Sequence, residues 1–448
     1  MEKLHSIINY LDSIVWGPFM LVLLIGTGVL ITLRLGFIQV RLLPKALKLI
    51  FFKGKSENVQ GDITPFQALT TALSATIGTG NIAGVATAIA TGGPGAIFWM
   101  WLSAFFGMAT KYAEAVLAVN FRKKLEDGTS IGGPMYYLKE GLSNKFLGNI
   151  LGVLFAIFGI VASFGIGSMV QSHSVAMAVN DAFNLPKGVT GFILMVLTAL
   201  VIIGGIKRIG KVTEKIVPFM AVFYFIFAII IIVLNFGNFL DVLVLIFKSA
   251  FSPVAAVGGF AGAAVKDAIR YGVARGVFSN EAGLGSAPIA HAAAKTDNPV
   301  RQGLVAMTGV FFDTIIICSL TAFVILLTGV WDSGKTSTEL TAMAFVTVFG
   351  GNGKMFLALA LIFFAYSTIL GWSYYGEQCA KFLFGYKFSY FYKIVYSLSV
   401  FYGAFRKTAF VWDMADLFNG MMAIPNLIGL IFLSGLLVKI TKEKIDEV

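Results

Sequence analysis

The stretch TALSATIGTGNIAGVATAIATGG, residues 71–93, is apolar enough for a bilayer, but the tetrapeptide GTGN at residues 78–81 interrupts its middle. Within lipid every backbone N–H and C=O group needs a hydrogen-bond partner, so irregular backbone is tolerated only where protein or a polar cavity receives it. The interruption therefore predicts a membrane helix that is broken at a binding site. Close helix packing through small residues, such as Gly80 and Gly84, is the alternative interpretation.

The composition of the whole chain is that of a membrane protein. Of its 448 residues, 57% are hydrophobic and 13% are charged, and the mean hydropathy is +0.84. A soluble core cannot hide this much apolar surface, so we expect one polytopic integral domain over residues 1–448 in the lipid bilayer of the cell membrane. The net charge of +11 does not indicate nucleic acid as a partner, because Lys and Arg lie between the hydrophobic runs, where cytosolic loops are basic.

The cysteines and the N-terminus add two expectations. Cys318 and Cys379 fall inside apolar runs without metal-type spacing, so they support packing rather than a disulfide framework or a zinc site. The N-terminal apolar stretch is too long for a signal peptide and has no small-residue cleavage site. We therefore expect it to be retained as the first span.

Apolar runs of roughly 20 residues recur along the chain and predict about eleven helices. The predicted spans are 14–33, 65–91, 95–121, 147–179, 190–205, 214–235, 253–285, 302–329, 354–380, 388–405 and 410–438. Basic residues follow every second span, in segments 34–55, 122–124, 207–215, 295–301, 381–387 and 439–444. Arg406 and Lys407 are exceptions to this alternation. Because cytosolic loops are enriched in Lys and Arg, the pattern predicts an N-terminus outside and a C-terminus in the cytosol.

A second set of glycines interrupts another predicted span. Gly258, Gly259 and Gly262 fall in the apolar first half of 253–285, which starts five spans after the first broken helix and runs in the opposite direction. Equivalent breaks in two halves are typical of secondary transporters built from inverted repeats. We therefore expect antiparallel five-helix halves over 65–235 and 253–438, with the span 14–33 outside them.

Four segments resemble the sodium:alanine symporters, also called the alanine or glycine:cation symporter family. They are GGPGAIFWMWLSAFFG at 92–107, SATIGTGNIAG at 74–84, FSNEAGLGSAPIAHAAAK at 278–295 and GWSYYGEQC at 371–379. The resemblance covers nearly the whole chain and implies an all-α LeuT-type fold with a five-plus-five inverted repeat. It also implies import of alanine or glycine together with a co-transported sodium ion.

The two half-helices at the first break present opposite charges. Free N–H groups at the start of the outer half suit a carboxylate, and Thr79, Gly80 and Asn81 are positioned to offer them. The carbonyl groups around Ala75 and Gly78, at the end of the inner half, suit a hard cation. The sequence therefore predicts that the amino acid and sodium bind side by side.

The LeuT-type resemblance implies that sodium completes its shell with Ser367 and Thr368 in the segment FFAYSTILGW. In an isolated Ser-Thr pair, bonding of both hydroxyl groups back to carbonyls one turn earlier is the alternative. The expected ammonium acceptors are the carbonyls near Gly259 in the second break. Gln171 is a candidate for a side-chain contact with the substrate or, equally, for an interhelical hydrogen bond. The candidate walls around the substrate side chain are Phe164, Phe260 and Trp372.

Charged residues inside the spans have several interpretations. Lys111 and Glu114 share a helix face, where an internal ion pair is favoured over a proton relay. Asp313 is either a coupling residue or a hydrogen-bond partner of a neighbouring helix. Alternating charges around the second break suggest ion pairs of a cytosolic gate; they are Lys266, Asp267, Arg270, Arg275 and Glu281.

Three other functions compete with sodium-coupled symport by alternating access. An enzyme is not supported, because His5, His173 and His291 are scattered and no catalytic motif is present. A channel needs a continuous hydrated path rather than a compact site. A proton-coupled carrier of small neutral amino acids is the serious alternative, with Lys111, Glu114 or Asp313 as proton carriers. The sequence does not decide between alanine, glycine and serine, because one methylene changes pocket affinity by only about 1–3 kcal/mol.

Overall fold

The computed structural model describes residues 2–51, 59–125, 128–405 and 409–448. Lys53, Lys55, Arg406 and Lys407, which entered the prediction of membrane orientation, lie outside these residues. The described chain is a bundle of helices with one short antiparallel hairpin, in which Lys123 pairs with Ile131. Both cysteines are buried and free, as expected of packing residues.

The elements follow one another in this order: α1 (Glu2–Val15), α2 (Pro18–Arg34), α3 (Ile38–Arg41), α4 (Leu43–Phe51), α5 (Pro65–Thr76), the π-helical η1 (Gly80–Gly84), α6 (Val85–Gly92), α7 (Ala96–Asn120), β1 (Lys123–Lys124), β2 (Ser130–Ile131), α8 (Pro134–Gly141), α9 (Lys145–Ala162), the π-helical η2 (Ser163–Met169), α10 (Val170–Phe183), α11 (Lys187–Ile202), α12 (Gly205–Leu234), η3 (Phe236–Asn238), α13 (Phe239–Phe251), α14 (Val265–Asn280), α15 (Ala287–Ala292), α16 (Pro299–Val310), the π-helical η4 (Phe311–Cys318), α17 (Ser319–Leu327), η5 (Val330–Asp332), α18 (Ser337–Phe349), α19 (Asn352–Phe384), α20 (Phe388–Phe405) and α21 (Ala409–Lys444).

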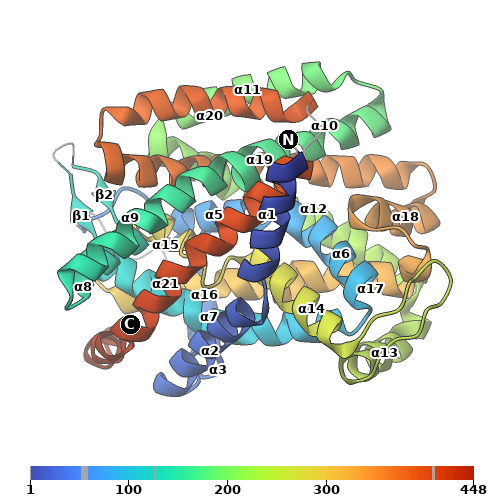
Figure 1. Cartoon of the computed structure of the whole chain (residues 1–448), viewed down its shortest axis with the longest axis horizontal. Helices are drawn as coiled ribbons and strands as arrows, with labels where there is room; N and C mark the ends of the chain where they lie inside the picture. Colours follow the sequence, from blue (N-terminus) through green and yellow to red (C-terminus); the bar gives the residue numbers. More distant parts are fainter. Residues whose placement is uncertain (1, 52–58, 126–127, 406–408) are drawn as a thin grey trace.

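Seven described helical segments are long and apolar enough to cross a membrane. The pair formed by α5 and the helix over Gly80–Gly92 passes the same test together, with a bend of 51° between its halves. These segments correspond to eight of the predicted spans, including the broken first helix. The predicted spans 190–205 and 388–405 correspond to the shorter α11 and α20, which pack side by side along one edge of the bundle (Figure 1).

The position predicted for the second break is wrong. Residues 252–264 form a loop before α14, in which Gly258 and Gly262 have positive φ angles of 55° and 88°. The helix that begins at Val265 ends at Asn280, and after an interruption at 281–286 the chain continues as α15. This break lies in the segment EAGLGS, whose glycines also take positive φ angles, so the same type of glycine signal occurs twice and only the second one divides a helix.

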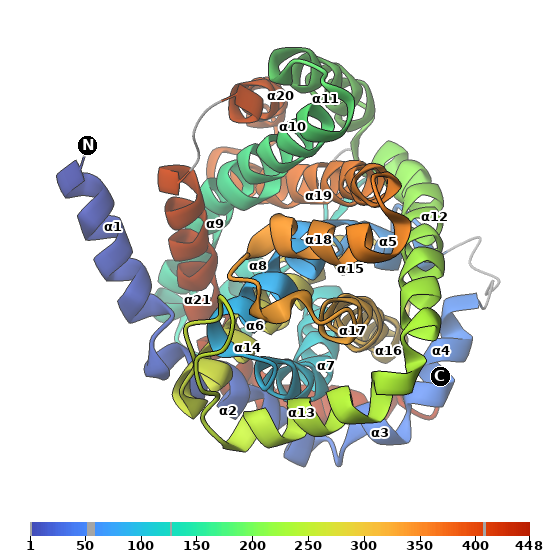
Figure 2. The same cartoon turned by 90° about the vertical axis from the view of Figure 1, so that its right-hand side faces the viewer.

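The broken helices lie inside the bundle, and α1 lies at its periphery. In Figure 2, α5, α6 and α15 are surrounded by α7, α12, α19 and α21, whereas α1 lies outside α21, against which it packs. The predicted first span, 14–33, corresponds to α2, which packs against α7 and α21, and its place outside the two repeats stays a prediction. The division of the remaining helices into two inverted repeats stays a prediction.

Several connections that were predicted to share one side of the membrane meet at one end of the bundle. The N–H groups of Asp62 and Ile63 donate to Ala293 O, and the N–H of Lys295 donates to Ile63 O. The Arg122 guanidinium donates to carbonyls of the same connection between α15 and α16. We call this end, where segments 60–63, 122–125, 128–131 and 292–298 meet, the basic end.

Candidate functional site

The first break begins where α5 ends. A capping box between Thr64 and Gln67 starts this helix, with Pro65 in its first turn, and Ile77 leaves the helical conformation with a ψ of 91°. After the break, η1 runs into α6. The side chain of Asn81 folds back across the gap, because its Oδ1 accepts a hydrogen bond of 2.8 Å from Gly78 N. The sequence GTGN thus contains both the interruption and the amide that braces it.

Asn81 also connects this break to a buried aspartate. Its Nδ2 donates to Asp313 Oδ1 over 2.7 Å, and Asp313 Oδ2 accepts from Ser279 Oγ over 2.9 Å and from Thr314 Oγ1 over 2.7 Å. Ser279 belongs to α14, directly before the second break. Asp313 on η4 therefore links the two broken helices, and the Asn81 side chain positions the break rather than remaining free for a ligand.

Glycines at the break allow close approach of the surrounding helices. A Cβ atom at Gly78 would overlap with Thr368 Oγ1 and lie 3.6 Å from Gln171 Oε1. A Cβ at Gly80 would lie 3.3 Å from the Phe278 ring and from the Ser279 backbone. The structure therefore brings together three residues that the sequence analysis proposed separately: Gly78, Gln171 and Thr368.

The proposed sodium ligands lie where α19 crosses the end of α5. A Cβ at Gly371 would lie 2.8 Å from the Ala75 Cβ, so the two helices touch at this point. Both hydroxyl groups of the Ser-Thr pair donate to Phe364 O, at 2.8 Å from Ser367 and 3.0 Å from Thr368, as the back-bonding alternative expects. Ser367 Oγ also lies 3.3 Å from Ser74 O on α5. The crossing thus gathers hydroxyl and carbonyl oxygens, the ligand type that hard cations prefer.

Two buried polar atoms beside the break have no hydrogen-bond partner among the described residues. They are Thr79 Oγ1 and Gln171 Oε1, in side chains of residues that are 1% and 2% exposed. The other end of the Gln171 amide donates to Ile166 O in η2, which fixes its orientation. Buried polar groups are rarely left unpaired, and each exception asks for an explanation such as a ligand or water. Thr79 and Gly80 also line a cavity of 160 Å³.

The structure separates two of the predicted substrate contacts from this site. Gly259 and Phe260 lie in the loop before α14, where Phe260 packs on Trp331 at 5.4 Å and faces Gly93. Gly93 follows the last residue of α6, which places this contact about 20 Å along the helix from Gly80. These two residues are therefore removed from the substrate site, because the loop carries them to the end of α6.

The other two predicted wall residues have defined partners. Trp372 is buried against Gly167, and its Nε1 donates to Glu281 Oε1 over 2.9 Å. It thus contacts the second break directly. The ring of Phe164 packs against Tyr392 and Tyr396 of α20, which turns it toward the edge formed by α11 and α20.

The second break is satisfied by charged side chains of α7. Lys111 Nζ donates to Asn280 O over 2.8 Å at the C-terminal end of α14, and Glu114 Oε1 accepts from the N–H groups of Gly283 and Gly285, each over 3.1 Å. Cations favour helix C-termini and anions favour helix N-termini, so each charge lies at the suitable end. The predicted internal ion pair is replaced by this arrangement, in which the two charges bind opposite halves of one broken helix.

Asn426 on α21 completes the second break. Its Nδ2 lies 2.7 Å from Glu114 Oε1 and 2.8 Å from Gly283 O, and the hydroxyl of Tyr137 donates to its Oδ1. The role of Asn426 was not predicted from the sequence, because an isolated Asn in an apolar helix does not indicate its hydrogen-bond partner. The only sequence signal was the glycine pattern EAGLGS, which marks backbone that needs partners.

Arg275 on α14 has its charged partner on another helix. Arg275 lies 3.5 Å from Asp416 of α21, and its guanidinium lies 5.5 Å from the Phe278 ring centre. Arg275 and Phe278 stand between the 160 Å³ cavity at Thr79 and a second cavity of 60 Å³ that Asp12 also lines. Arg275 was predicted to follow the second break, but α14 precedes this break and is the half of the broken helix that leads away from the basic end.

The remaining residues predicted for this gate lie elsewhere. Lys266 is exposed, and Asp267 accepts from Ala264 N at the start of α14. Arg270 lines the smaller cavity. Glu281 lies in the second break, where it accepts from Trp372 and from the Ser286 hydroxyl.

Comparison with known proteins identifies relatives over the whole chain. Residues 1–446 match the model of the sodium:alanine symporter family. The chain is 56% identical over 441 residues to the sodium/alanine symporter AgcS of Methanococcus maripaludis, covering 98% of this chain and 96% of that protein. It is 39% identical over 442 residues to the putative sodium/proton-dependent alanine carrier protein YrbD of Bacillus subtilis, covering 95% and 89%. These relatives are transporters and not enzymes.

A solved structure shares the fold. The crystal structure of MhsT in complex with L-phenylalanine superposes with a TM-score of 0.57 at 12% identity, covering 85% of this chain and 99% of that chain. The LeuT-type fold expected from the sequence resemblance is thereby confirmed. At this level of identity the similarity concerns the arrangement of helices and not the ligand.

Proposed function

Because this chain belongs to the sodium:alanine symporter family, we propose that it carries alanine, and also glycine, across the membrane together with sodium. The first break is the proposed binding site. The observation that carries the proposal is the pair of unpaired buried oxygens at Thr79 and Gln171, beside the crossing of α5 and α19. If the glycines of the first break served only close helix packing, two unpaired buried oxygens would not be expected beside them.

The carboxylate of the amino acid binds at the start of η1. The first N–H groups of a helix have no partner within the helix, and their partial positive charge favours an anion. Thr79 and Gly80 supply these groups, and the Asn81 side chain holds their backbone in place through Gly78 and Asp313. The Thr79 hydroxyl and the Gln171 amide oxygen then receive polar contacts from the substrate.

Sodium binds at the end of α5, beside the carboxylate. The carbonyl groups of Ala75 and Gly78 and the hydroxyl groups of Ser367 and Thr368 are its proposed ligands. Since both hydroxyls donate to Phe364 O, each retains lone pairs that accept a cation. Sodium and alanine then stabilise the same arrangement of α5 and α19, so each strengthens binding of the other by the same factor.

Alternating access is proposed to use both ends of this site. Arg275 and Asp416 close the route away from the basic end. Positive residues favour the cytosolic side, so the basic end faces the cytosol, the N-terminus lies outside and the route past Arg275 is the entrance. The halves 65–235 and 253–438 move as inverted repeats around the two breaks.

The test is binding and counterflow of isotope-labelled alanine by the purified protein, with sodium or with choline as the cation. We expect tight binding only with sodium, and labelled glycine to be displaced by unlabelled alanine. Sodium-independent binding of alanine contradicts symport with sodium. Glycine that fails to compete restricts the proposal to alanine.

Proton coupling is the second candidate, because YrbD is named as a sodium/proton-dependent carrier and Asp313 is a buried carboxyl group that links both breaks. It predicts that alanine binding follows pH at constant sodium. Substitution of Asp313 by Asn then removes the pH dependence but leaves the sodium dependence. If binding is independent of pH in the unmutated protein, this candidate is excluded.

A further inference from the structure

A separate cavity of 230 Å³ lies at the basic end. It is lined by the segment before α5, the turn between α11 and α12, the last turns of α19 and the start of α20. The residues that matter here are Asp62, Glu377, Gln378, Lys381, Ser389 and Lys393. Neither the substrate nor the sodium site described above includes any of them.

The cavity continues the line of the binding site along α19. Tyr374 and Gln378 follow Ser367 by seven and eleven residues, a spacing that keeps them on one helix face, and both line the cavity. Gln378 lies about 15 Å along the helix axis from Thr368. Asp62 lines the opposite wall, shortly before α5 begins. The cavity therefore lies between the first break and the basic end along α19, the direction in which a solute would leave toward that end.

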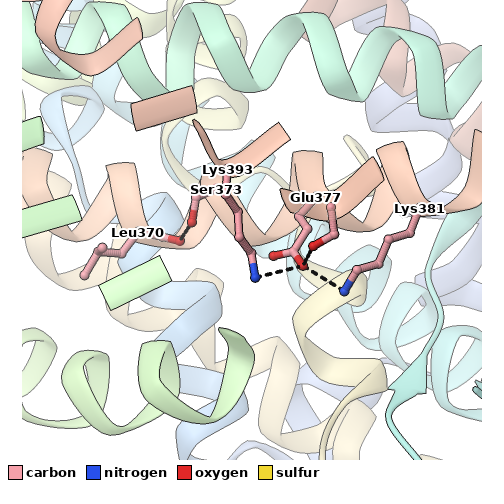
Figure 3. A network of polar contacts seen from close by, with 6 residues as sticks. Leu370, Ser373, Glu377, Lys381 and Lys393 are labelled. Atoms are coloured by element: carbon pink, nitrogen blue, oxygen red, sulfur yellow. Dashed lines mark hydrogen bonds and ion pairs between the residues drawn. The ribbon is translucent and has the colours of Figure 1, made fainter. Parts of the chain in front are cut away.

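Two lysines in this cavity share a single carboxylate oxygen. Glu377 Oε1 lies 2.7 Å from Lys381 Nζ and 3.3 Å from Lys393 Nζ, and it accepts from Ser389 Oγ over 2.6 Å (Figure 3). The side chains of the two lysines are only 11% and 13% exposed. With Lys207 the cavity wall carries three lysines against the two carboxylates of Asp62 and Glu377, so one positive charge remains, and an unbalanced charge is costly where it is buried. The second acid on the cavity wall, Asp62, accepts from the backbone of Ser130.

The same cavity contains an acceptor without a donor. Gln378 is 3% exposed, and its Oε1 has no hydrogen-bond partner among the described residues. A buried amide oxygen in this situation needs an N–H or O–H group from a ligand or from water. The cavity therefore has two unmet requirements, an anion for the lysines and a donor for Gln378.

We infer that this cavity is a release subsite for the amino acid on its way to the basic end. This inference rests on the proposed function, because it takes the transported amino acid as the ligand. A zwitterion meets both requirements, with its carboxylate at Lys381 and Lys393 and its ammonium at Gln378 Oε1. An inorganic anion without a hydrogen-bond donor, such as sulfate, meets the first requirement and leaves the second unmet. The subsite receives the substrate after the first break lets it go and lowers the barrier to release.

The variant Lys393→Met tests the subsite with little risk to folding, because Glu377 keeps Lys381 as its partner. Lys393→Arg retains the positive charge and should restore function. The matched control is Lys387→Met, on an exposed lysine near the start of α20 that does not line the cavity. Gln378→Leu removes the contact with the ammonium.

Alanine transport is measured in proteoliposomes from each side separately, at saturating sodium. For Lys393→Met we expect the KM for alanine offered at the basic end to rise about tenfold, the usual loss of one charged hydrogen bond, with the KM from the opposite end changed less than twofold. Gln378→Leu should show the same asymmetry, and Lys387→Met should behave as the parent. Addition of sulfate at the basic end should not raise the KM for alanine of the parent protein.

Three results overturn the inference. Equal changes from both sides place Lys393 outside the route, and equal effects of Lys387→Met reduce it to a general surface-charge effect. Loss of function in Lys393→Met with an unaffected Gln378→Leu, together with competition by sulfate, identifies a site for anions only. Failure of the proposed function is recognised separately, because the unmutated protein would then bind alanine without sodium.

Discussion

The two helix breaks differ in what satisfies their exposed backbone. At the second break the protein supplies the partners itself, with Lys111 on the carbonyl end and Glu114 on the N–H end. At the first break the Asn81 side chain takes one N–H, and oxygens of Thr79 and Gln171 stay unpaired. Glu114 Oε2 at the second break also has no partner among the described residues, but the backbone groups there are bound by Lys111 and by Glu114 Oε1. We therefore propose that the second break is a fixed joint and that the first, where two oxygens from different helices are unpaired, is a binding site.

The largest effect is expected when the fixed joint loses its anion. Glu114→Ala removes the acceptor of the Gly283 and Gly285 N–H groups and one of the two acceptors of the Asn426 amide, and it removes one of the carboxyl groups near Lys111. Removal of one member of a buried charged network costs about 3–5 kcal/mol, so we expect little folded protein. Thermal unfolding in detergent measures the loss.

Glu114→Gln is the matched control, because it keeps an acceptor oxygen and should retain more folded protein than the alanine variant. If Glu114→Ala folds as well as the parent and loses only transport, the second break is not a fixed joint. The two breaks would then not differ in the roles proposed for them.

The next effect concerns the first break. Gly78→Ala places a methyl group on the Thr368 hydroxyl, whereas Gly80→Ala places one at 3.3 Å from a phenylalanine ring that can shift. We expect Gly78→Ala to weaken both sodium and alanine binding at least about 100-fold, a cost of roughly 3 kcal/mol that is typical of overpacking. Equilibrium binding to monodisperse protein checks this, and Gly80→Ala should lose much less. Equal losses would show that the contact with α19 is unimportant.

A smaller effect is expected at the crossing of α5 and α19. Ser367→Ala or Thr368→Ala removes one oxygen that is proposed to bind sodium, and we expect the sodium concentration needed for alanine binding to rise about tenfold. Alanine affinity at saturating sodium should change little, because linkage shows a lost cation ligand only while sodium is limiting. Titration of alanine binding at several sodium concentrations measures this. If the hydroxyls only bond back to Phe364 O, both variants will follow the parent at every concentration.

One of the two breaks was predicted correctly from the sequence. The first break was predictable because GTGN interrupts an otherwise apolar run, and its neighbours Ser367 and Thr368 came from resemblance to a family. The second break was misplaced, because the glycines at 258–262 carry the same local signal as those at 283 and 285. Which of the two divides a helix depends on the partners at each place, and α7 supplies them only at 283 and 285.

The partners of the charged residues also could not be predicted from sequence spacing alone. Spacing on α7 predicts that Lys111 and Glu114 share a face, and they do bind one neighbouring element. Spacing does not reveal that this element is a broken helix, whose ends attract opposite charges. Arg275 was likewise predicted to follow the second break, whereas it precedes the break because α14 ends only at Asn280. In this chain the sequence predicted where the backbone of a helix is interrupted at the first break, but it did not predict which distant residues bind the charged side chains.

The smallest effect, and the one whose direction is most informative, is expected for Thr79→Val. Valine has nearly the shape of threonine, so the change removes one unpaired buried hydroxyl and little else. Removing a buried polar group that has no partner should stabilise the free protein, while loss of one hydrogen bond to the carboxylate should weaken alanine binding by about fivefold. Thermal unfolding with and without saturating alanine measures both quantities in one experiment. We expect a higher unfolding temperature without alanine and a smaller increase on its addition. If the hydroxyl has no ligand, the unfolding temperature without alanine rises, but its increase on addition of alanine equals that of the parent. Thr79 would then not contribute to a binding site at the first break.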